Sequence, residues 1–179
     1  MILYLNFNRN PRQPAPFYGR RKKWAIAIIG LMAFQFGFGQ TSYIKKYRPL
    51  ADSLSLEYEI PAAVILGVAI IESSSGTGKT AKLLNNHFGI IGKNKLLKTK
   101  GIRTRYKQYD TVADSYVAFC HLVKKRKYYK KLKGIQDYRP WVDAISKSGY
   151  TEAPALWKQR VSAAIKSNKL AAPPLKTGL

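Results

Sequence analysis

The chain has 179 residues, and its 32 lysine and arginine residues against 9 aspartate and glutamate residues give a net charge of +23 at pH 7. This length suits one domain with terminal extensions and is long enough to bury a core. The excess of positive charge indicates a polyanionic partner, such as nucleic acid, an acidic membrane surface or an anionic wall polymer. The single cysteine, Cys120, excludes an intramolecular disulfide.

Residues 1–39 are predicted to be an N-terminal extension that ends in an export signal. The basic cluster Arg20–Lys23 precedes the uncharged stretch Trp24–Gly39, and small residues at Gly37 and Gly39 suit a cleavage site. The apolar stretch is about 16 residues long, against roughly 20 for a membrane span. An uncleaved signal anchor in the inner membrane stays open as an alternative, and N-terminal sequencing of the native protein distinguishes the two.

Export has consequences for the partner and the location. We expect the protein in the periplasm, at the cell surface or secreted, with membrane contact only through an uncleaved leader. An exported basic protein meets the cell envelope, so anionic cell-envelope polymers are the expected partners of its positive charge, and nucleic acid is not.

Residues 40–170 are predicted to form one mainly α-helical domain. Apolar residues in Ser42–Leu56 recur at helical spacing. Pro61 suits a first helical turn, and the apolar run to Ile71 is too long and too rich in alanine for a typical strand. We therefore expect a buried helix that ends near Glu72, followed by a loop over Ser73–Gly78.

The second half of this domain is predicted to contain a lobe and three helices. The basic, glycine-containing segment Gly92–Tyr109 is predicted to form a small β-hairpin or mobile lobe. Thr111 and Asp114 fit a capping box at the start of a helix. Further helices are expected over Trp141–Ser148 and Pro154–Ser167, and residues 171–179 are expected to form a tail.

One motif superficially matches a nucleotide site. The apolar run before Ser73, followed by Gly78-Lys79-Thr80, looks like a strand and a phosphate-binding loop. However, Ser73 stands where that loop requires its first glycine, and no apolar run ending in an aspartate of the Walker B type follows. Nucleotide binding is therefore not expected.

A second set of motifs is more specific. It comprises Ala69-Ile70-Ile71-Glu72-Ser73-Ser74-Ser75-Gly76, Asn85-Asn86-His87-Phe88-Gly89-Ile90, Tyr109-Asp110, Asp114-Ser115-Tyr116 and Gly149-Tyr150-Thr151. In these motifs, over roughly residues 42–170, the chain resembles glycoside hydrolase family 73, the lysozyme-like bacterial peptidoglycan glucosaminidases. The resemblance implies a lysozyme-like α+β fold with a small β-hairpin lobe. It also implies hydrolysis of the β-1,4 bond between N-acetylglucosamine and N-acetylmuramic acid in peptidoglycan glycan strands.

The resemblance assigns Glu72 as the proton donor. Protonation of a glycosidic oxygen needs a carboxylic acid whose pKa is raised by apolar surroundings, which the run before Glu72 can supply. The alternative is a solvated residue at a helix end. Tyr150 corresponds to the late tyrosine of the family, which orients the sugar or stabilises positive charge; as an alternative it is a buried aromatic residue in a turn.

The motifs also supply candidates for substrate binding. Asn86, Phe88 and Gly89 are expected to form the floor and wall of a glycan cleft, or otherwise a structural turn. Further substrate-binding candidates are Ser73, Gly76 and Tyr109. His87 and His121 are isolated, no metal-ligand spacing exists, and we expect a monomer without metal or cofactor.

The second catalytic group is left open by the sequence. Residues 91–109, where the family often carries an acid, contain no aspartate or glutamate. Asp110 is the nearest candidate, although an acid is also favoured there by the dipole of the following helix. One remaining mechanism uses the 2-acetamido group of the substrate as nucleophile. The other uses water activated by a more distant acid, with inversion and carboxyl groups roughly 6.5–9.5 Å apart.

Two other functions remain as alternatives. A lytic transglycosylase also uses a glutamate followed by serine, but usually has Gly-Leu-Met-Gln where this chain has Phe88-Gly89-Ile90. A non-catalytic glycan-binding protein of the cell wall would account for the missing acid in residues 91–109.

Overall fold

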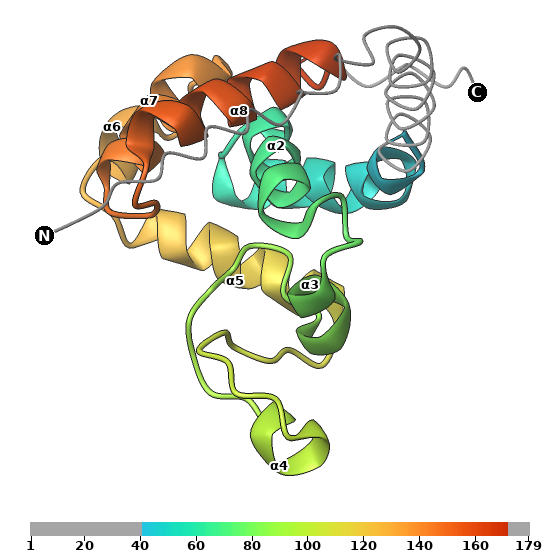
Figure 1. Cartoon of the computed structure of the whole chain (residues 1–179). Helices are drawn as coiled ribbons and strands as arrows, with labels where there is room; N and C mark the ends of the chain where they lie inside the picture. Colours follow the sequence, from blue (N-terminus) through green and yellow to red (C-terminus); the bar gives the residue numbers. More distant parts are fainter. Residues whose placement is uncertain (1–40, 172–179) are drawn as a thin grey trace, which may run out of the picture. The chain divides into compact units, whose positions relative to one another are not determined.

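The computed structural model describes residues 41–171. The predicted leader and nearly all of the predicted tail lie outside these residues. Residues 41–58 are helical. The remaining helices, in chain order (Figure 1), are α2 (Ala62–Ser73), α3 (Lys79–Leu84), α4 (Leu96–Lys100), α5 (Val112–Lys124), α6 (Tyr129–Leu132), α7 (Tyr138–Lys147) and α8 (Pro154–Ser167).

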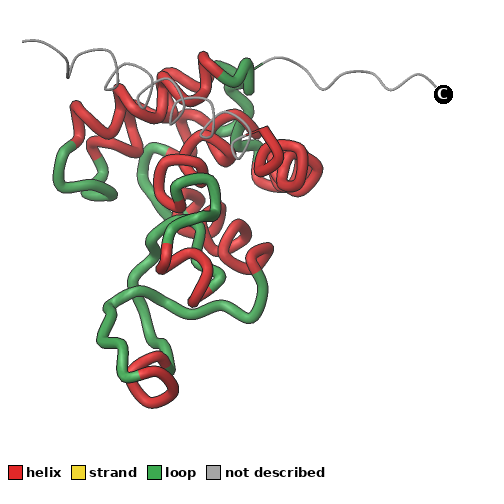
Figure 2. Tube along the Cα trace, turned by 45° about the vertical axis from the view of Figure 1, so that its right-hand side comes forward, coloured by secondary structure: helices red, strands yellow, loops and turns green. Residues whose placement is uncertain are grey.

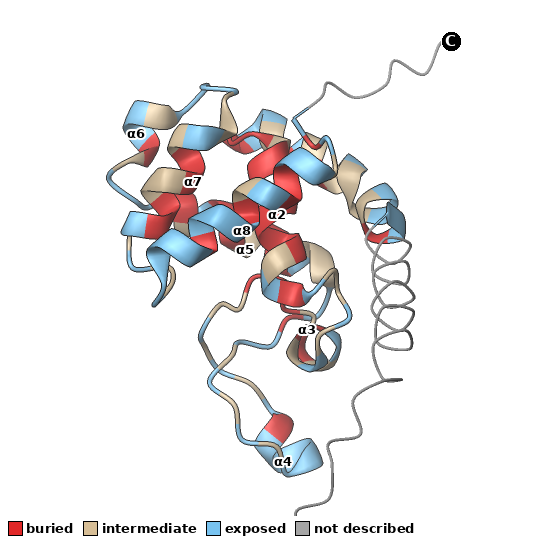
Figure 3. Ribbon diagram, turned by 45° about the horizontal axis from the view of Figure 1, so that its top comes forward, coloured by how far each residue is buried: buried red, intermediate tan, exposed pale blue. Residues whose placement is uncertain are grey.

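Helix α2 forms the centre of the core. It carries no charge before Glu72 and is buried on almost every side, as expected for a helix with apolar residues all round (Figure 3). It packs mainly against α8 and also contacts α5 and α7. Gly67 permits the closest approach, because a Cβ atom there would lie 2.6 Å from Cγ1 of Ile165 on α8. The buried helix predicted to end near Glu72 is therefore confirmed.

The helices of the second half follow their local sequence signals. Thr111 accepts a hydrogen bond from the Asp114 backbone N–H, and the Asp114 carboxylate accepts one from the Thr111 N–H, so the predicted capping box begins α5. Pro154 occupies the first turn of α8, where its missing N–H costs nothing. The domain is mainly α, as predicted.

The predicted β-hairpin lobe is wrong. The first arm, residues 89–95, and the second arm, residues 101–109, run antiparallel, but only Ile91 and Tyr106 form a β-bridge. No strand occurs anywhere in residues 41–171. Figure 2 shows both arms as loops that carry the short helix α4 at their tip.

A side chain explains why the arms do not form a hairpin. The amide of Asn94 donates to the backbone carbonyls of Thr104 and Tyr106, at 3.0 and 2.9 Å, and its carbonyl accepts from the Leu96 N–H. These bonds take the place of ladder hydrogen bonds and begin α4. Gly101, with φ of +66°, ends α4 in the left-handed conformation.

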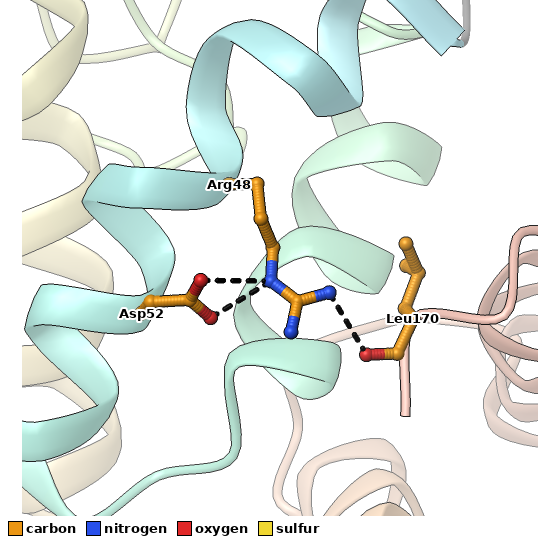
Figure 4. Close-up of polar contacts among 3 residues, drawn as sticks. All are labelled: Arg48, Asp52 and Leu170. Atoms are coloured by element: carbon orange, nitrogen blue, oxygen red, sulfur yellow. Dashed lines mark hydrogen bonds and ion pairs between the residues drawn. The ribbon is translucent and has the colours of Figure 1, made fainter. Parts of the chain in front are cut away.

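The first helix and the end of the domain are joined by a polar contact (Figure 4). Nε of Arg48 donates to both carboxylate oxygens of Asp52, at 2.8 and 3.0 Å, and Nη1 donates to the Leu170 carbonyl at 3.4 Å. The Leu170 side chain is itself buried in the core. Among the described helices, none combines the length and the apolar character that crossing a membrane requires.

Candidate active site

An open cavity of about 630 Å³ lies at the end of α2. Four parts of the chain line it: the end of α2, residues 88–91 with the second arm, the end of α5, and the loop between α7 and α8. The lining residues are Glu72, Phe88, Gly89, Ile90, Ile91, Arg105, Tyr106, Leu122, Arg126, Gly149, Tyr150, Thr151, Glu152 and Ala153.

Glu72 is held in this cavity by two neighbours. Trp157, a buried residue on the first turn of α8, donates its indole N–H to Oε1 of Glu72 at 2.6 Å. Gly89 passes close to the other oxygen, since a Cβ atom there would lie 3.4 Å from Oε2. Gly89 has a φ of +63°, so a side chain at this position would be strained as well as close to the carboxylate.

The end of α2 fixes where Glu72 stands. Helix α2 ends at Ser73, because the next residue, Ser74, adopts the left-handed conformation. The buried Ser73 hydroxyl donates to the Ala69 carbonyl at 2.6 Å and accepts from the Gly76 N–H at 2.8 Å. Ser73 therefore stabilises the turn that follows Glu72, and its side chain is not part of the cavity lining.

The environment of Glu72 favours the protonated carboxyl group. Partial burial raises the pKa of Glu72 above its ordinary value, and the hydrogen bond from Trp157 opposes this rise. At the same time the residue keeps an exposed surface toward the cavity. A carboxylic acid that stays protonated nearer to neutral pH and remains open to a ligand is suited to act as a general acid.

Tyr150 connects the loop between α7 and α8 to the residues beside Glu72. Its hydroxyl donates to the Phe88 carbonyl at 2.8 Å, and its ring centroid lies 5.5 Å from that of Trp157. Burial raises the pKa of Tyr150, and the negative charge of Glu72 raises it further. The Tyr150 side chain is therefore a neutral phenol whose O–H donates to the Phe88 carbonyl, and Tyr150 also lines the cavity.

Asn86 holds the base of the two arms. Its carbonyl oxygen accepts from the backbone N–H groups of Phe88 and Ile90, and its amide donates to the carbonyls of Ile90 and Lys107. The residue is almost completely buried and does not line the cavity. These four bonds use both polar groups of the Asn86 side chain and give it a structural task.

The structure thus brings together only some of the predicted site residues. Glu72, Phe88, Gly89 and Tyr150 line one cavity. The remaining candidates are not among its lining residues: Ser73, Gly76, Asn86, Tyr109 and Asp110.

The positions of three of these candidates have clear local reasons. Gly76 lies against the Tyr43 ring: a Cβ atom added at Gly76 would lie 3.0 Å from Cε2 of that ring. Tyr109 is the buried last residue of the second arm, and its N–H donates to the Leu84 carbonyl. The carbonyl of Asp110 accepts from the Asn85 side chain.

The cavity also contains residues that the sequence motifs did not indicate. Trp157 is 85 positions from Glu72 in the chain, and no spacing rule connects them. Arg105, Arg126 and Glu152 add charge to the lining, and Arg105 pairs with Glu152 at 3.9 Å. The sequence contained one indication of Glu152, because this residue directly follows the motif Gly149-Tyr150-Thr151.

The histidines and acids do not form a metal site within residues 41–171. His87 is buried, with Nδ1 2.8 Å from the Tyr43 hydroxyl, and burial lowers its pKa to about 4. It is therefore neutral at physiological pH and belongs to an aromatic cluster with Tyr43, Tyr47 and Tyr116.

Comparison with known proteins gives one family and two similar folds. Residues 48–170 match the glucosaminidase family model, described as mannosyl-glycoprotein endo-beta-N-acetylglucosaminidase. The search of curated proteins gave no match.

One similar structure is a peptidoglycan hydrolase mutant from Sphingomonas sp. A1, with 20% identity and a TM-score of 0.57 over 72% of this chain and 94% of that chain. Another comes from a type VI secretion system effector-immunity complex from Pseudomonas protegens, with 19% identity and a TM-score of 0.55 over 75% of this chain and 95% of that one. At these identities the two structures establish a shared fold.

Proposed function

We propose that this chain, which belongs to the glucosaminidase family known as glycoside hydrolase family 73, hydrolyses peptidoglycan glycan strands. The bond cleaved is the β-1,4 linkage between N-acetylglucosamine and N-acetylmuramic acid. The observation that carries the proposal is the placement of Glu72, a carboxyl group with a raised pKa that opens into a cavity.

Glu72 is proposed to donate its proton to the glycosidic oxygen. As the bond between the anomeric carbon and this oxygen breaks, negative charge develops on the oxygen. A positioned acid neutralises this charge by transferring a proton to the oxygen. The Trp157 N–H fixes the orientation of the carboxyl group. The cavity volume of about 630 Å³ is in the range of pockets that bind small ligands, and is large enough for sugar rings.

Charge supports a peptidoglycan substrate. Two arginines, Arg105 and Arg126, line the cavity, and the arms together with α4 carry exposed lysines at positions 93, 95, 98, 100 and 107. N-acetylmuramic acid and its peptides carry carboxylates, which such a surface attracts over a distance of about 10 Å at moderate salt. The similar fold from Sphingomonas is that of a protein named as a peptidoglycan hydrolase, in agreement with this substrate. We further propose that the arms attract other anionic polymers of the envelope.

The proposal is tested by the products that the purified protein releases from peptidoglycan. After borohydride reduction, mass spectrometry should find muropeptides that end in reduced N-acetylglucosamine, because hydrolysis by a glucosaminidase leaves that sugar at the new reducing end. Heat-denatured protein serves as the control.

The other possible products each contradict the proposal in a different way. A 1,6-anhydro end would identify a lytic transglycosylase, and reduced N-acetylmuramic acid would place the cleavage on the other side of that sugar. No release above the control would favour a glycan-binding protein without activity.

A further inference from the structure

We propose that Glu152 is the general base that activates the hydrolytic water, and that the reaction inverts the anomeric configuration. The inference rests on the proposed function, since it assigns the second catalytic group of the same site. Of the mechanisms that the sequence leaves open, it selects water activated by a more distant acid over the 2-acetamido group of the substrate, and Glu152 over Asp110.

The cavity lining offers few acids. Among the described residues that line it, Glu72 and Glu152 are the only two acids. The two arms contain no acid, and Asp110 lies outside the lining. A carboxylate mechanism at this site therefore has one available partner for Glu72.

Glu152 stands in the short loop between α7 and α8, two residues after Tyr150. The Tyr150 hydroxyl donates to the Phe88 carbonyl at 2.8 Å, and within the loop the Ala153 N–H donates to the Thr151 hydroxyl at 3.2 Å. The side chain of Tyr150 thus connects the loop that carries Glu152 to the backbone at Phe88, next to Gly89 and the Glu72 carboxylate.

The surroundings of the two glutamates differ. Glu72 is partly buried and bonded to an indole N–H, whereas the Glu152 side chain is 96% exposed. Two carboxyl groups in one cavity whose environments differ in this way are the usual arrangement for an acid and a base. A base must contact water, and Glu152 does so from the lining of the cavity.

The ion pair with Arg105 is compatible with this task. Its N–O distance is 3.9 Å, and both side chains are largely exposed, so the pair is weak. Because Arg105 also lines the cavity, a bound glycan can attract its guanidinium and release the Glu152 carboxylate toward water.

The proposed step is a single displacement. The Glu152 carboxylate takes a proton from water while the water oxygen forms a bond to the anomeric carbon. The bond from that carbon to the glycosidic oxygen breaks, its electron pair goes to the oxygen, and the oxygen receives the proton of Glu72. The product is the α-anomer of the new reducing sugar, and solvent returns a proton from Glu152 to Glu72.

The experiment uses the full chain with a soluble, uncrosslinked glycan oligomer of peptidoglycan. Proton NMR during the first turnovers should show the α-anomer with the wild type. Glu152→Gln should lower kcat by at least about 100-fold, as expected for loss of a general base. Added azide, which needs no base, should restore turnover of this variant and yield an α-glycosyl azide. Glu57→Gln is the matched control, because Glu57 is an exposed glutamate outside the cavity lining, and it should behave as the wild type.

Three results would overturn the inference. They are a first-formed β-anomer, a Glu152→Gln variant within a few-fold of the wild type, and a slow variant that azide does not rescue. Each of them requires an active wild type, so each is distinct from failure of the proposed function, which is an inactive wild type in the same assay.

Discussion

Glu72→Gln is expected to lower kcat/KM for peptidoglycan by about 1,000- to 10,000-fold, the upper part of the range for general acid catalysis. Glutamine has nearly the same shape and keeps an oxygen that can accept the Trp157 N–H bond, but it has no proton to give. The leaving oxygen would then depart with a full negative charge. Substrate binding should change little, because the cavity keeps its form.

The measurement is turnover of soluble glycan oligomers, supported by clearing of peptidoglycan in zymograms. Glu57→Gln again provides a glutamate-to-glutamine change outside the cavity lining and should retain activity. Thermal unfolding followed by circular dichroism should show a folded Glu72→Gln protein, since Glu72 has an exposed surface and forms no salt bridge among residues 41–171. Clearing by this variant at the wild-type rate would rule out Glu72 as the acid.

The sequence was sufficient to predict the helix that presents Glu72. The uncharged apolar run from Pro61 to Ile71 is too long and too rich in alanine for a typical strand, so it predicts a buried helix with Glu72 at its end. Phe88 and Gly89, from the motif that follows about one short helix later in the chain, also reach the cavity as expected. These predictions succeeded because the helix follows from the order of apolar residues within one segment, and because Phe88 and Gly89 belong to a motif that lies close to Glu72 in the sequence.

The functions of polar residues inside those motifs could not be predicted in the same way. Asn86 stands in the most specific motif, yet its amide is used by the backbone of Phe88 and by the backbone of the two arms. The β-hairpin prediction was wrong for a related reason, because Asn94 binds the backbone that a strand would use. Neither arrangement can be predicted from the amino-acid composition or from the spacing of apolar residues. Each depends on where the second arm lies relative to the asparagine.

Trp157 is the clearest case of a residue that only the fold brings to the site. It lies on α8, and the close packing of α8 on α2, permitted by Gly67, places its indole against Glu72. In the sequence, Trp157 is only one of several apolar residues of the helix predicted over Pro154–Ser167, and nothing marks it as a site residue. We therefore expect its effect on catalysis to be large although it carries no acid, base or nucleophile.

Trp157→Phe is expected to lower kcat by up to about 100-fold, because the carboxyl group loses the bond that orients its proton, and small misplacements of reacting groups have effects of this size. It should also change the pH dependence. A general acid acts when protonated, so activity is present below its pKa and is lost as the pH rises through it. Burial raises the pKa of Glu72 and the Trp157 bond lowers it, so removal of the bond should move the alkaline limb to higher pH.

The measurement is kcat against pH for wild type and variant. Trp141→Phe is the matched control, since it removes a buried indole N–H whose acceptor is the Ile135 carbonyl rather than Glu72. It should lower thermal stability and leave the alkaline limb in place. If Trp157→Phe moves that limb to lower pH, or leaves it unchanged while activity falls, then the bond to Glu72 does not control its protonation. The role of Trp157 would then be limited to orienting the carboxyl group of Glu72 and to packing α8 against α2.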